Sequence, residues 1–147
     1  YFLGLDKKYP QNKKFGAYRQ TFLAEEEISE VDSVAGSFLM MPRTLFDNLG
    51  GFDESFFMYG EDLDLCFRIK QKGLSVVYYG KAAITHLKGQ SGLHTKSEEV
   101  VRHFYDAMII FYKKHYKNKY SKIVNVIVYL GIKFKYTMTI LKLKLGL

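Results

Sequence analysis

The sequence contains a single cysteine, Cys66, among its 147 residues. No intrachain disulfide can therefore form, nothing requires an oxidising compartment, and the paired-cysteine spacing of a zinc site is missing. The first residues also lack the basic start, apolar core and small-residue cleavage site of a signal peptide. The sequence starts at Tyr1 and not at methionine, which is expected if it begins inside a longer protein.

Acidic residues are missing from the last part of the chain. Residues 107–147 hold nine lysines and no Asp or Glu, whereas residues 1–106 hold thirteen basic and fifteen acidic side chains. The formal net charge of +7 therefore comes from the tail. Lysines mixed with Ile, Leu, Phe and Tyr favour peripheral contact of residues 121–147 with an anionic membrane surface.

A long apolar run is also missing from this tail. The longest, Ile123 to Ile132, has ten residues, whereas a membrane-spanning helix needs roughly 20. On a helical wheel, Lys133 and Lys144 lie almost opposite Lys135 and Lys142, so no clean amphipathic face is expected. Packing of the tail on a partner subunit, including a second copy of the chain, is the alternative to membrane contact.

The remaining sequence is that of a globular domain, since 48% of its residues are apolar and 16% aromatic, which excludes a disordered chain. Periodicity, glycines and prolines predict the elements. In order, we expect a loop-rich lead-in at 1–30, a buried strand at 31–43, one or two helical turns at 44–51, a helix at 61–72, strands at 74–80 and 82–86, a helix at 97–116 with Thr95 and Glu98 at capping-box spacing, and the tail.

An acidic cluster opens the helix predicted at 61–72, in the stretch GGFDESFFMYGEDLDLCFRIKQKG. Carboxylates in the first turn are favoured by the helix dipole, so Glu61 and Asp62 can be explained as structural. Asp64 makes three acids within four residues, and such a cluster is expected to face water, a cation or a polar substrate. The D-x-D spacing resembles a metal site, but residues i and i+2 of a helix diverge by roughly 200°, so Asp62 and Asp64 should have different roles.

The apolar face of this helix is expected to carry Leu63, Cys66 and Phe67, packed on a core. Arg68 stands one turn after Asp64, at the spacing of an i, i+4 ion pair. The aromatic run that precedes the helix is more often core than pocket lining.

Residues 34–91, VAGSFLMMPRTLFDNLGGFDESFFMYGEDLDLCFRIKQKGLSVVYYGKAAITHLKGQS, resemble the acceptor-side half of bacterial inverting family 2 glycosyltransferases of the rhamnosyltransferase-like kind. The pattern of these enzymes is matched in order over roughly 60 residues. It is carried by Gly36, Arg43, Gly50 to Glu54, Phe56, Phe57, Glu61, Asp62, Asp64, Leu65, Arg68, Gly73, Val76, Tyr78, His86, Gly89 and Ser91.

The resemblance implies an α/β chain with part of a GT-A fold, in which a mixed sheet carries flanking helices. It implies transfer of a hexosyl or deoxyhexosyl group, with inversion, from a nucleotide-sugar donor to a saccharide or lipid-linked acceptor. In that family the second residue of the Glu-Asp pair is the general base, which is Asp62 here. Glu61 would support the base, and Asp64, Tyr59 and Gly36 would contact the acceptor.

The resemblance also implies a divalent metal, Mn²⁺ or Mg²⁺, with His86 as one ligand beside a D-x-D farther upstream in the family. A histidine after an apolar strand, taken alone, is more often structural. The metal is expected only together with the family's nucleotide-binding half, an alternating strand and helix region that has no counterpart before Val31. We therefore expect the 147 residues alone to be inactive.

Three segments follow from these expectations: a lead-in at 1–30, the acceptor-side catalytic half at 31–96, and C-terminal helices with a basic apolar tail at 97–147. The expected location is the cytoplasm, with peripheral contact at the inner face of the cytoplasmic membrane. Signals for nucleic-acid binding, such as a helix-turn-helix, zinc knuckle or RNP-like run, are missing from the sequence. A non-catalytic module that binds a membrane surface or a subunit is the alternative to an enzyme.

Overall fold

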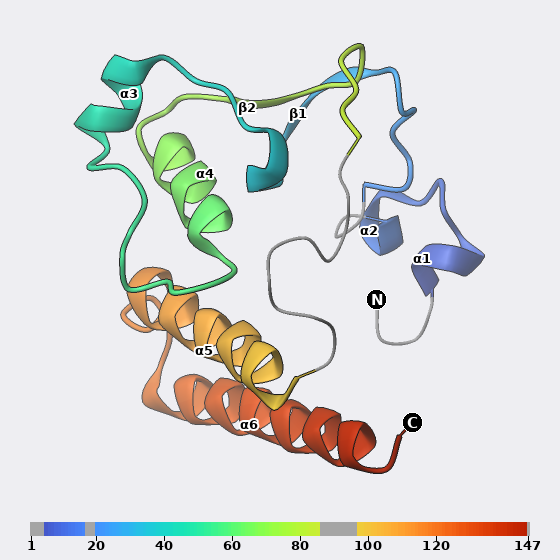
Figure 1. The fold of residues 1–147 in the computed structure, drawn as a ribbon, viewed down its shortest axis with the longest axis vertical. Coiled ribbons are helices and arrows are strands. Elements are labelled where there is room, and N and C mark those ends of the chain that lie inside the picture. Colours follow the sequence, from blue (N-terminus) through green and yellow to red (C-terminus); the bar gives the residue numbers. More distant parts are fainter. Residues whose placement is uncertain (1–4, 17–19, 86–96, 147) are drawn as a thin grey trace.

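The computed structural model describes residues 5–16, 20–85 and 97–146. Their order of elements confirms an α/β protein (Figure 1). The elements are α1 (Leu5–Lys8), α2 (Lys13–Gly16), β1 (Ile28–Val31), η1 (Gly36–Phe38), α3 (Arg43–Asn48), α4 (Glu61–Gln71), β2 (Val76–Tyr79), α5 (Glu98–His115) and α6 (Lys122–Lys144).

Strands β1 and β2 form an antiparallel pair, in which Ile28 lies opposite Tyr79 and Val31 opposite Val76. The sheet within the described residues is therefore antiparallel, and the expected mixed sheet stays a prediction, because a single pair of strands is only part of such a sheet. Strand β1 also begins inside the predicted lead-in at 1–30, so it crosses the proposed segment boundary. The lead-in otherwise contains two single-turn helices, α1 and α2.

Two strand predictions are wrong. Most of the strand expected at 31–43 is irregular, with the short helix η1 inside it, because the Gly36 amide bonds a side chain of α4 and not a neighbouring strand. Residues 82–85 are also irregular: the ladder ends where the Gly80 amide donates to the Glu27 carbonyl, at 3.1 Å. His86 lies outside the described residues.

Helix α4 closely matches the helix predicted at 61–72. Gly60, with φ +86°, precedes it and Gly73, with φ +74°, follows it, so residues suited to left-handed backbone stand at both ends. Its buried apolar face consists of Leu65, Cys66 and Ile69, which pack with Val31 and Val76 of the two strands.

The apolar face predicted for α4 is therefore shifted by one position. Leu63 remains 38% exposed, because the strands cover the neighbouring side of the helix. Cys66 was correctly expected in the core. Phe67 instead turns toward α5, where its ring meets Phe111 edge-on at 5.5 Å.

Helices α5 and α6 pack side by side, and α4 lies on the other side of α5 (Figure 1). The side chain of Ser97 caps α5 by accepting a hydrogen bond from the Val100 amide, whereas the predicted cap, Thr95, lies outside the described residues. Helix α6 is the tail of the sequence in helical form. Its 23 residues are long and apolar enough to cross a membrane by length and composition alone.

Candidate active site

Asp62 is held by two backbone amides at the start of α4. Its Oδ2 accepts a hydrogen bond of 2.8 Å from the Gly36 amide, and its Oδ1 accepts one of 2.7 Å from the Leu63 amide. The side chain is half-buried. A carboxylate has about four acceptor positions, so the protein holds this group in place and still leaves it able to accept a further proton.

Gly36 fits against Asp62 because it has no side chain. A Cβ at this position would lie 3.3 Å from the Asp62 Cβ and 3.5 Å from its Oδ2. Ala35 and Ser37, on either side of Gly36, line an open cleft of about 1030 Å³ that continues along residues 38–42 and β2. The structure thus brings together Gly36 and Asp62, which the sequence analysis predicted as site residues for different reasons. The neighbours of Gly36 line a cleft large enough for a substrate. The predicted contact of Gly36 with an acceptor stays a prediction.

Glu61 is the first residue of α4 and is also half-buried. Its Oε2 is shielded from solvent and has no hydrogen-bond partner among the described residues. A shielded carboxylate oxygen without a donor is costly, so this atom is suited to receive a hydrogen bond from a bound molecule.

Tyr59 stands two residues before α4 in an unusual backbone conformation, with φ +66°. Only a few per cent of residues other than glycine have a positive φ, and the conformation costs free energy. Its ring is 44% exposed and meets Phe104 of α5 edge-on at 6.0 Å. The left-handed pair Tyr59-Gly60 turns the chain into α4, which places a half-exposed aromatic ring beside the acidic helix start.

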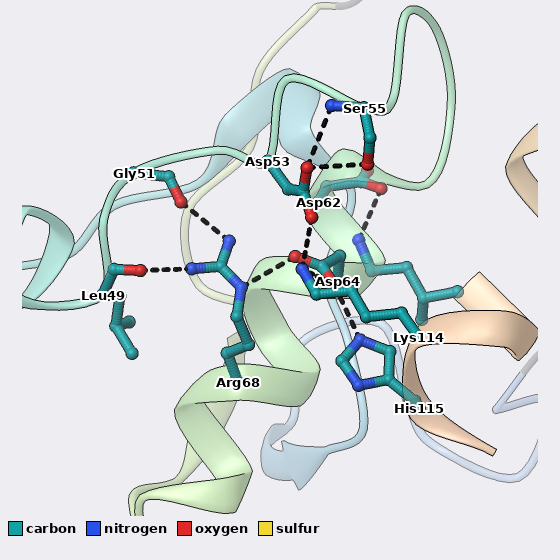
Figure 2. Close-up of polar contacts among 10 residues, drawn as sticks. Leu49, Gly51, Asp53, Ser55, Asp62, Asp64, Arg68, Lys114 and His115 are labelled. Atoms are coloured by element: carbon teal, nitrogen blue, oxygen red, sulfur yellow. Dashed lines mark hydrogen bonds and ion pairs between the residues drawn. The ribbon is translucent and has the colours of Figure 1, made fainter. Parts of the chain in front are cut away.

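Asp64 is fully buried, and its partners are side chains of the protein; its expected contact with the acceptor stays a prediction. Figure 2 shows its carboxylate surrounded by the side chains of Arg68, Lys114 and His115. Arg68 Nε lies 2.7 Å from Oδ2, while Lys114 Nζ and His115 Nε2 lie 2.8 Å and 2.7 Å from Oδ1. Burial alone would raise the pKa of Asp64, but the hydrogen bonds from Lys114, His115 and Arg68 outweigh it and hold that pKa below its ordinary value.

Arg68 connects this buried carboxylate to the glycine-rich turn before α4. Its guanidinium donates to the Leu49 carbonyl at 2.6 Å and to the Gly51 carbonyl at 2.7 Å (Figure 2). Gly50 and Gly51 both have positive φ, +77° and +70°, which explains the pair as a tight turn. The ion pair expected between Arg68 and Asp64 is confirmed, and it fixes the turn as well as the helix.

Lys114 joins a second acid of the motif to the same cluster. Its ammonium lies 2.5 Å from Asp53 Oδ2 and 2.8 Å from Asp64 Oδ1. The hydrogen bonds of Asp53 to Lys114 and to Ser55 hold its pKa far below the ordinary value. Burial alone would lower the pKa of Lys114, but its bonds to the two carboxylates raise it.

Sequence reasoning missed the contribution of α5 to this cluster. Lys114 and His115 lie some fifty residues after Asp64 along the chain, a separation that carries no periodic signal. Their place in the last turn of α5 was visible, because basic residues are favoured at helix C-termini. We define Asp53, Asp64, Arg68, Lys114 and His115 as the ion cluster; it fixes the motif around Asp62 and does not face the cleft.

The metal assignment stays a prediction. Across residues 5–16, 20–85 and 97–146, no three His, Cys, Asp or Glu side chains come together as ligands of an ion, and His86 lies outside these ranges. Asp62 faces Gly36 whereas Asp64 is enclosed by cations, so the two do not share one ion as a D-x-D pair would. No step proposed below passes through a metal.

The site is therefore a helix start of an α/β chain that carries a fixed, half-exposed carboxylate. The family described as "Glycosyltransferase like family 2" matches residues 11–105. This match covers well over half of the chain, so the chain belongs to glycosyltransferase family 2.

Curated relatives agree with this membership. N-acetylglucosaminyl-diphospho-decaprenol L-rhamnosyltransferase of Mycobacterium tuberculosis is 35% identical over 107 residues, which are 73% of this chain and 34% of that protein. Rhamnosyltransferase WbbL of Escherichia coli is 44% identical over 48 residues, 33% of this chain and 18% of that protein. The chain thus spans about a third of the mycobacterial relative's length. No solved structure matches it.

Proposed function

We propose that this chain forms the acceptor side of a glycosyltransferase that moves a hexosyl or deoxyhexosyl group from a nucleotide sugar to a saccharide or lipid-linked acceptor, with inversion. The observation that carries the proposal is the position of Asp62. Its carboxylate is fixed by the Gly36 amide at 2.8 Å, lies at the start of α4 and stays half-exposed. Asp62 does not itself line the open cleft, but Ala35 and Ser37, on either side of Gly36, do. The names of the relatives, two of which are rhamnosyltransferases, support the substrate class.

In this proposal Asp62 is the general base. A sugar hydroxyl is a poor nucleophile, and Asp62 takes its proton as the hydroxyl oxygen forms a bond to the anomeric carbon of the donor. The bond from that carbon to the diphosphate oxygen breaks in the same step, and the nucleoside diphosphate leaves. One displacement without a protein nucleophile inverts the anomeric centre. A positioned base of this kind contributes typically 10²–10⁴-fold.

Glu61 and Tyr59 are proposed to hold the acceptor. Glu61 would accept a hydrogen bond from an acceptor hydroxyl. Its Oε2 has no donor among the described residues but is shielded from solvent, so this bond requires the side chain of Glu61 to turn outward when the acceptor binds. The half-exposed ring of Tyr59 would lie against an apolar sugar face, with its hydroxyl available to the acceptor. Both residues flank Asp62, so a hydroxyl bound there would be close to the base.

The test is the substitution Asp62→Asn in the protein expressed from its complete reading frame. Asparagine keeps the shape, but it cannot take a proton, and its single oxygen can accept only one of the two bonds from the Gly36 and Leu63 amides. We therefore expect kcat to fall by about 10²–10⁴ while donor affinity is unchanged. Asp47→Asn is the matched control, because Asp47 forms an exposed ion pair with Arg43 on α3. Retained turnover in Asp62→Asn would assign the base to another residue.

We further propose that the reaction takes place at the cytoplasmic face of the membrane. We also propose that the 147 residues alone transfer no sugar. Within the described residues the sheet has two antiparallel strands, whereas a nucleotide-binding half of this fold requires alternating strands and helices. Incubation of the 147-residue chain with labelled nucleotide sugars and acceptors tests whether it transfers sugar alone. Measurable transfer would overturn that proposal.

A further inference from the structure

Helix α6 uses one side to pack against α5. Asn125 accepts a hydrogen bond from the Tyr112 hydroxyl at 2.7 Å, and the hydroxyls of Thr139 and Tyr105 are 2.8 Å apart. Ile132, midway between these contacts, is buried. This side of the helix is therefore fixed along its length by hydrogen bonds as well as by apolar contact.

The opposite side of α6 is an exposed apolar stripe. Its members follow one another at intervals of three or four residues and are between 41% and 74% exposed. They are Ile123, Ile127, Leu130, Phe134, Met138, Leu141 and Leu145. At about 100° per residue this spacing places them on one face of the helix. A continuous apolar face of this length usually marks an interaction surface.

Lysines border the apolar stripe on both sides. Lys122, Lys133 and Lys144 recur every eleven residues, which is close to three helical turns, so they follow one edge. Lys135 and Lys142 are seven residues apart and follow the other edge. The two groups of lysines lie almost opposite each other on the helical wheel, and for this reason no clean amphipathic face was expected from the sequence. In the structure the two groups are the two borders of the apolar stripe.

We propose that α6 lies in the surface of an anionic membrane, parallel to it, with the apolar stripe inserted among the acyl chains and the two lysine borders at the phosphate groups. An apolar face bounded by basic residues is what an interfacial helix presents to anionic lipid. Charge complementarity identifies the occupant: α6 contains five lysines and no acidic residue. An exposed ion pair of Lys144 with Glu98 of α5, at 3.3 Å, offsets one of these charges and leaves the helix with a positive excess. The inference does not depend on Asp62 or on glycosyl transfer.

The same features disfavour two other arrangements. If α6 spanned the bilayer, its middle residue, Lys133, would lie near the bilayer centre with Lys135 beside it, and an ammonium group there is costly. If a second copy covered the apolar stripe, the lysine borders of the two helices would meet each other. Neither helix offers a carboxylate in return, so like charges would be brought together.

The first test uses the absence of tryptophan from the sequence. Phe134→Trp places one fluorophore on the apolar stripe. Met40→Trp is the control, because Met40 is 85% exposed in the segment between η1 and α3, which Figure 1 shows away from α6. With vesicles of phosphatidylglycerol and phosphatidylcholine, the emission of Phe134→Trp should shift to the blue and that of Met40→Trp should not. Lipid spin labels near the headgroup should quench the tryptophan emission of Phe134→Trp more strongly than labels near the bilayer centre.

The second test measures flotation of the full chain with the same vesicles. Phe134→Glu should weaken binding at least tenfold by removing a large apolar side chain from the stripe, whereas Met40→Glu should leave it unchanged. Lys133→Gln and Lys142→Gln should each weaken it about fivefold, and vesicles of phosphatidylcholine alone should bind weakly. All four substituted positions are exposed, so unchanged thermal unfolding is the expected check of folding.

Three outcomes would overturn the proposal. Equal flotation of Phe134→Glu and the parent chain would show that the apolar stripe does not bind lipid. Stronger quenching from the bilayer centre than from the headgroup would indicate a spanning helix. A dimer that Phe134→Glu converts to a monomer in light scattering, without lipid binding by the parent, would assign the stripe to a second copy.

Discussion

The Gly36 amide donates a hydrogen bond of 2.8 Å to Oδ2 of Asp62, although the two residues are 26 positions apart in the chain. This contact draws the segment after β1 toward the start of α4 and away from the sheet. It also sets the direction of the carboxylate proposed as the base. The backbone at Gly36 therefore acts on Asp62 as a positioning group, and its lack of a side chain is part of that role.

Gly36→Ala should lower kcat about tenfold or more, with little change in stability. The added Cβ would lie 3.3 Å from the Asp62 Cβ, so the carboxylate must move by a few tenths of an ångström, and small displacements of a reacting group are costly in rate. The measurement is kcat and KM for the acceptor in the protein expressed from its complete reading frame. A loss in kcat is expected, with thermal unfolding changed by only a few degrees.

Gly131→Ala is the matched control for this substitution. Gly131 lies within α6, and a Cβ there would meet nothing within 4 Å. Alanine is favoured over glycine inside a helix by up to about 1 kcal/mol, so this variant should be slightly more stable and equally active. Equal kcat in Gly36→Ala and Gly131→Ala would contradict a positioning role for Gly36.

Asp64→Asn should destabilise the fold strongly. The substitution leaves Arg68, Lys114 and His115 around a buried neutral group, and removal of one partner from a buried ion pair costs about 3–5 kcal/mol. Because Lys114 keeps some contact with solvent and also pairs with Asp53, we expect the lower end, about 3 kcal/mol. Urea unfolding followed by circular dichroism measures this.

Asp47→Asn provides the comparison for Asp64→Asn. Asp47 also pairs with an arginine four residues away, Arg43, but both side chains are exposed. Exposed pairs contribute about 0–1 kcal/mol. If the two variants lost the same stability, the ion cluster would not be the structural centre that its burial indicates.

These residues also show which parts of the molecule a sequence can predict. Helix α4 was predictable because its signals are local: acids at its start, basic residues at its end, a following glycine and the spacing of Asp64 to Arg68. The strand expected at 31–43 was wrong because the partner of Gly36 is a side chain far along the sequence. Local β-propensity carries no information about such a bond.

The candidate site was likewise predictable only in part from the sequence. The motif predicted both Asp62 and Asp64 as site residues. Only the three-dimensional structure shows that Asp62 is half-exposed and Asp64 fully buried. The difference depends on Lys114 and His115, which arrive from α5. Two neighbouring acids in one short motif therefore have unlike environments, and conservation of the pattern in a family would not by itself distinguish a base from a structural anion.

Acid should destabilise the fold below the ordinary pKa of Asp, 3.8. The folded-state pKa values of Asp53 and Asp64 are both lowered, so the unfolded chain binds protons first as pH falls. The stabilisation is fully present above pH 3.8 and is lost as pH decreases toward the folded-state values. Lys114, whose pKa is raised above 10.5, adds stabilisation that is lost only as pH rises beyond that value.

The measurement is the urea midpoint as a function of pH. We expect these groups to contribute their full stabilisation between about pH 5 and 9, so the midpoint should change little with pH there, decline below pH 4 and decline again above pH 10.5. Asp53→Asn should reduce the acid decline, because it removes one of the two lowered groups. An unchanged acid decline in that variant would mean that other carboxylates cause it.

Tyr59→Phe should raise the acceptor KM several-fold and leave kcat and stability nearly unchanged. Phenylalanine keeps the ring that meets Phe104 edge-on at 6.0 Å and requires the same backbone, with φ +66°. Only the hydroxyl proposed to bond the acceptor is lost, and such a bond is worth about 0.5–1.5 kcal/mol. Steady-state kinetics with varied acceptor measure the effect. Tyr120→Phe is the matched control, because Tyr120 is 51% exposed between α5 and α6 and does not line the cleft. An unchanged acceptor KM in Tyr59→Phe would remove its hydroxyl from the acceptor site, whereas a fall in kcat alone would indicate that Tyr59 positions α4 and the base that it carries.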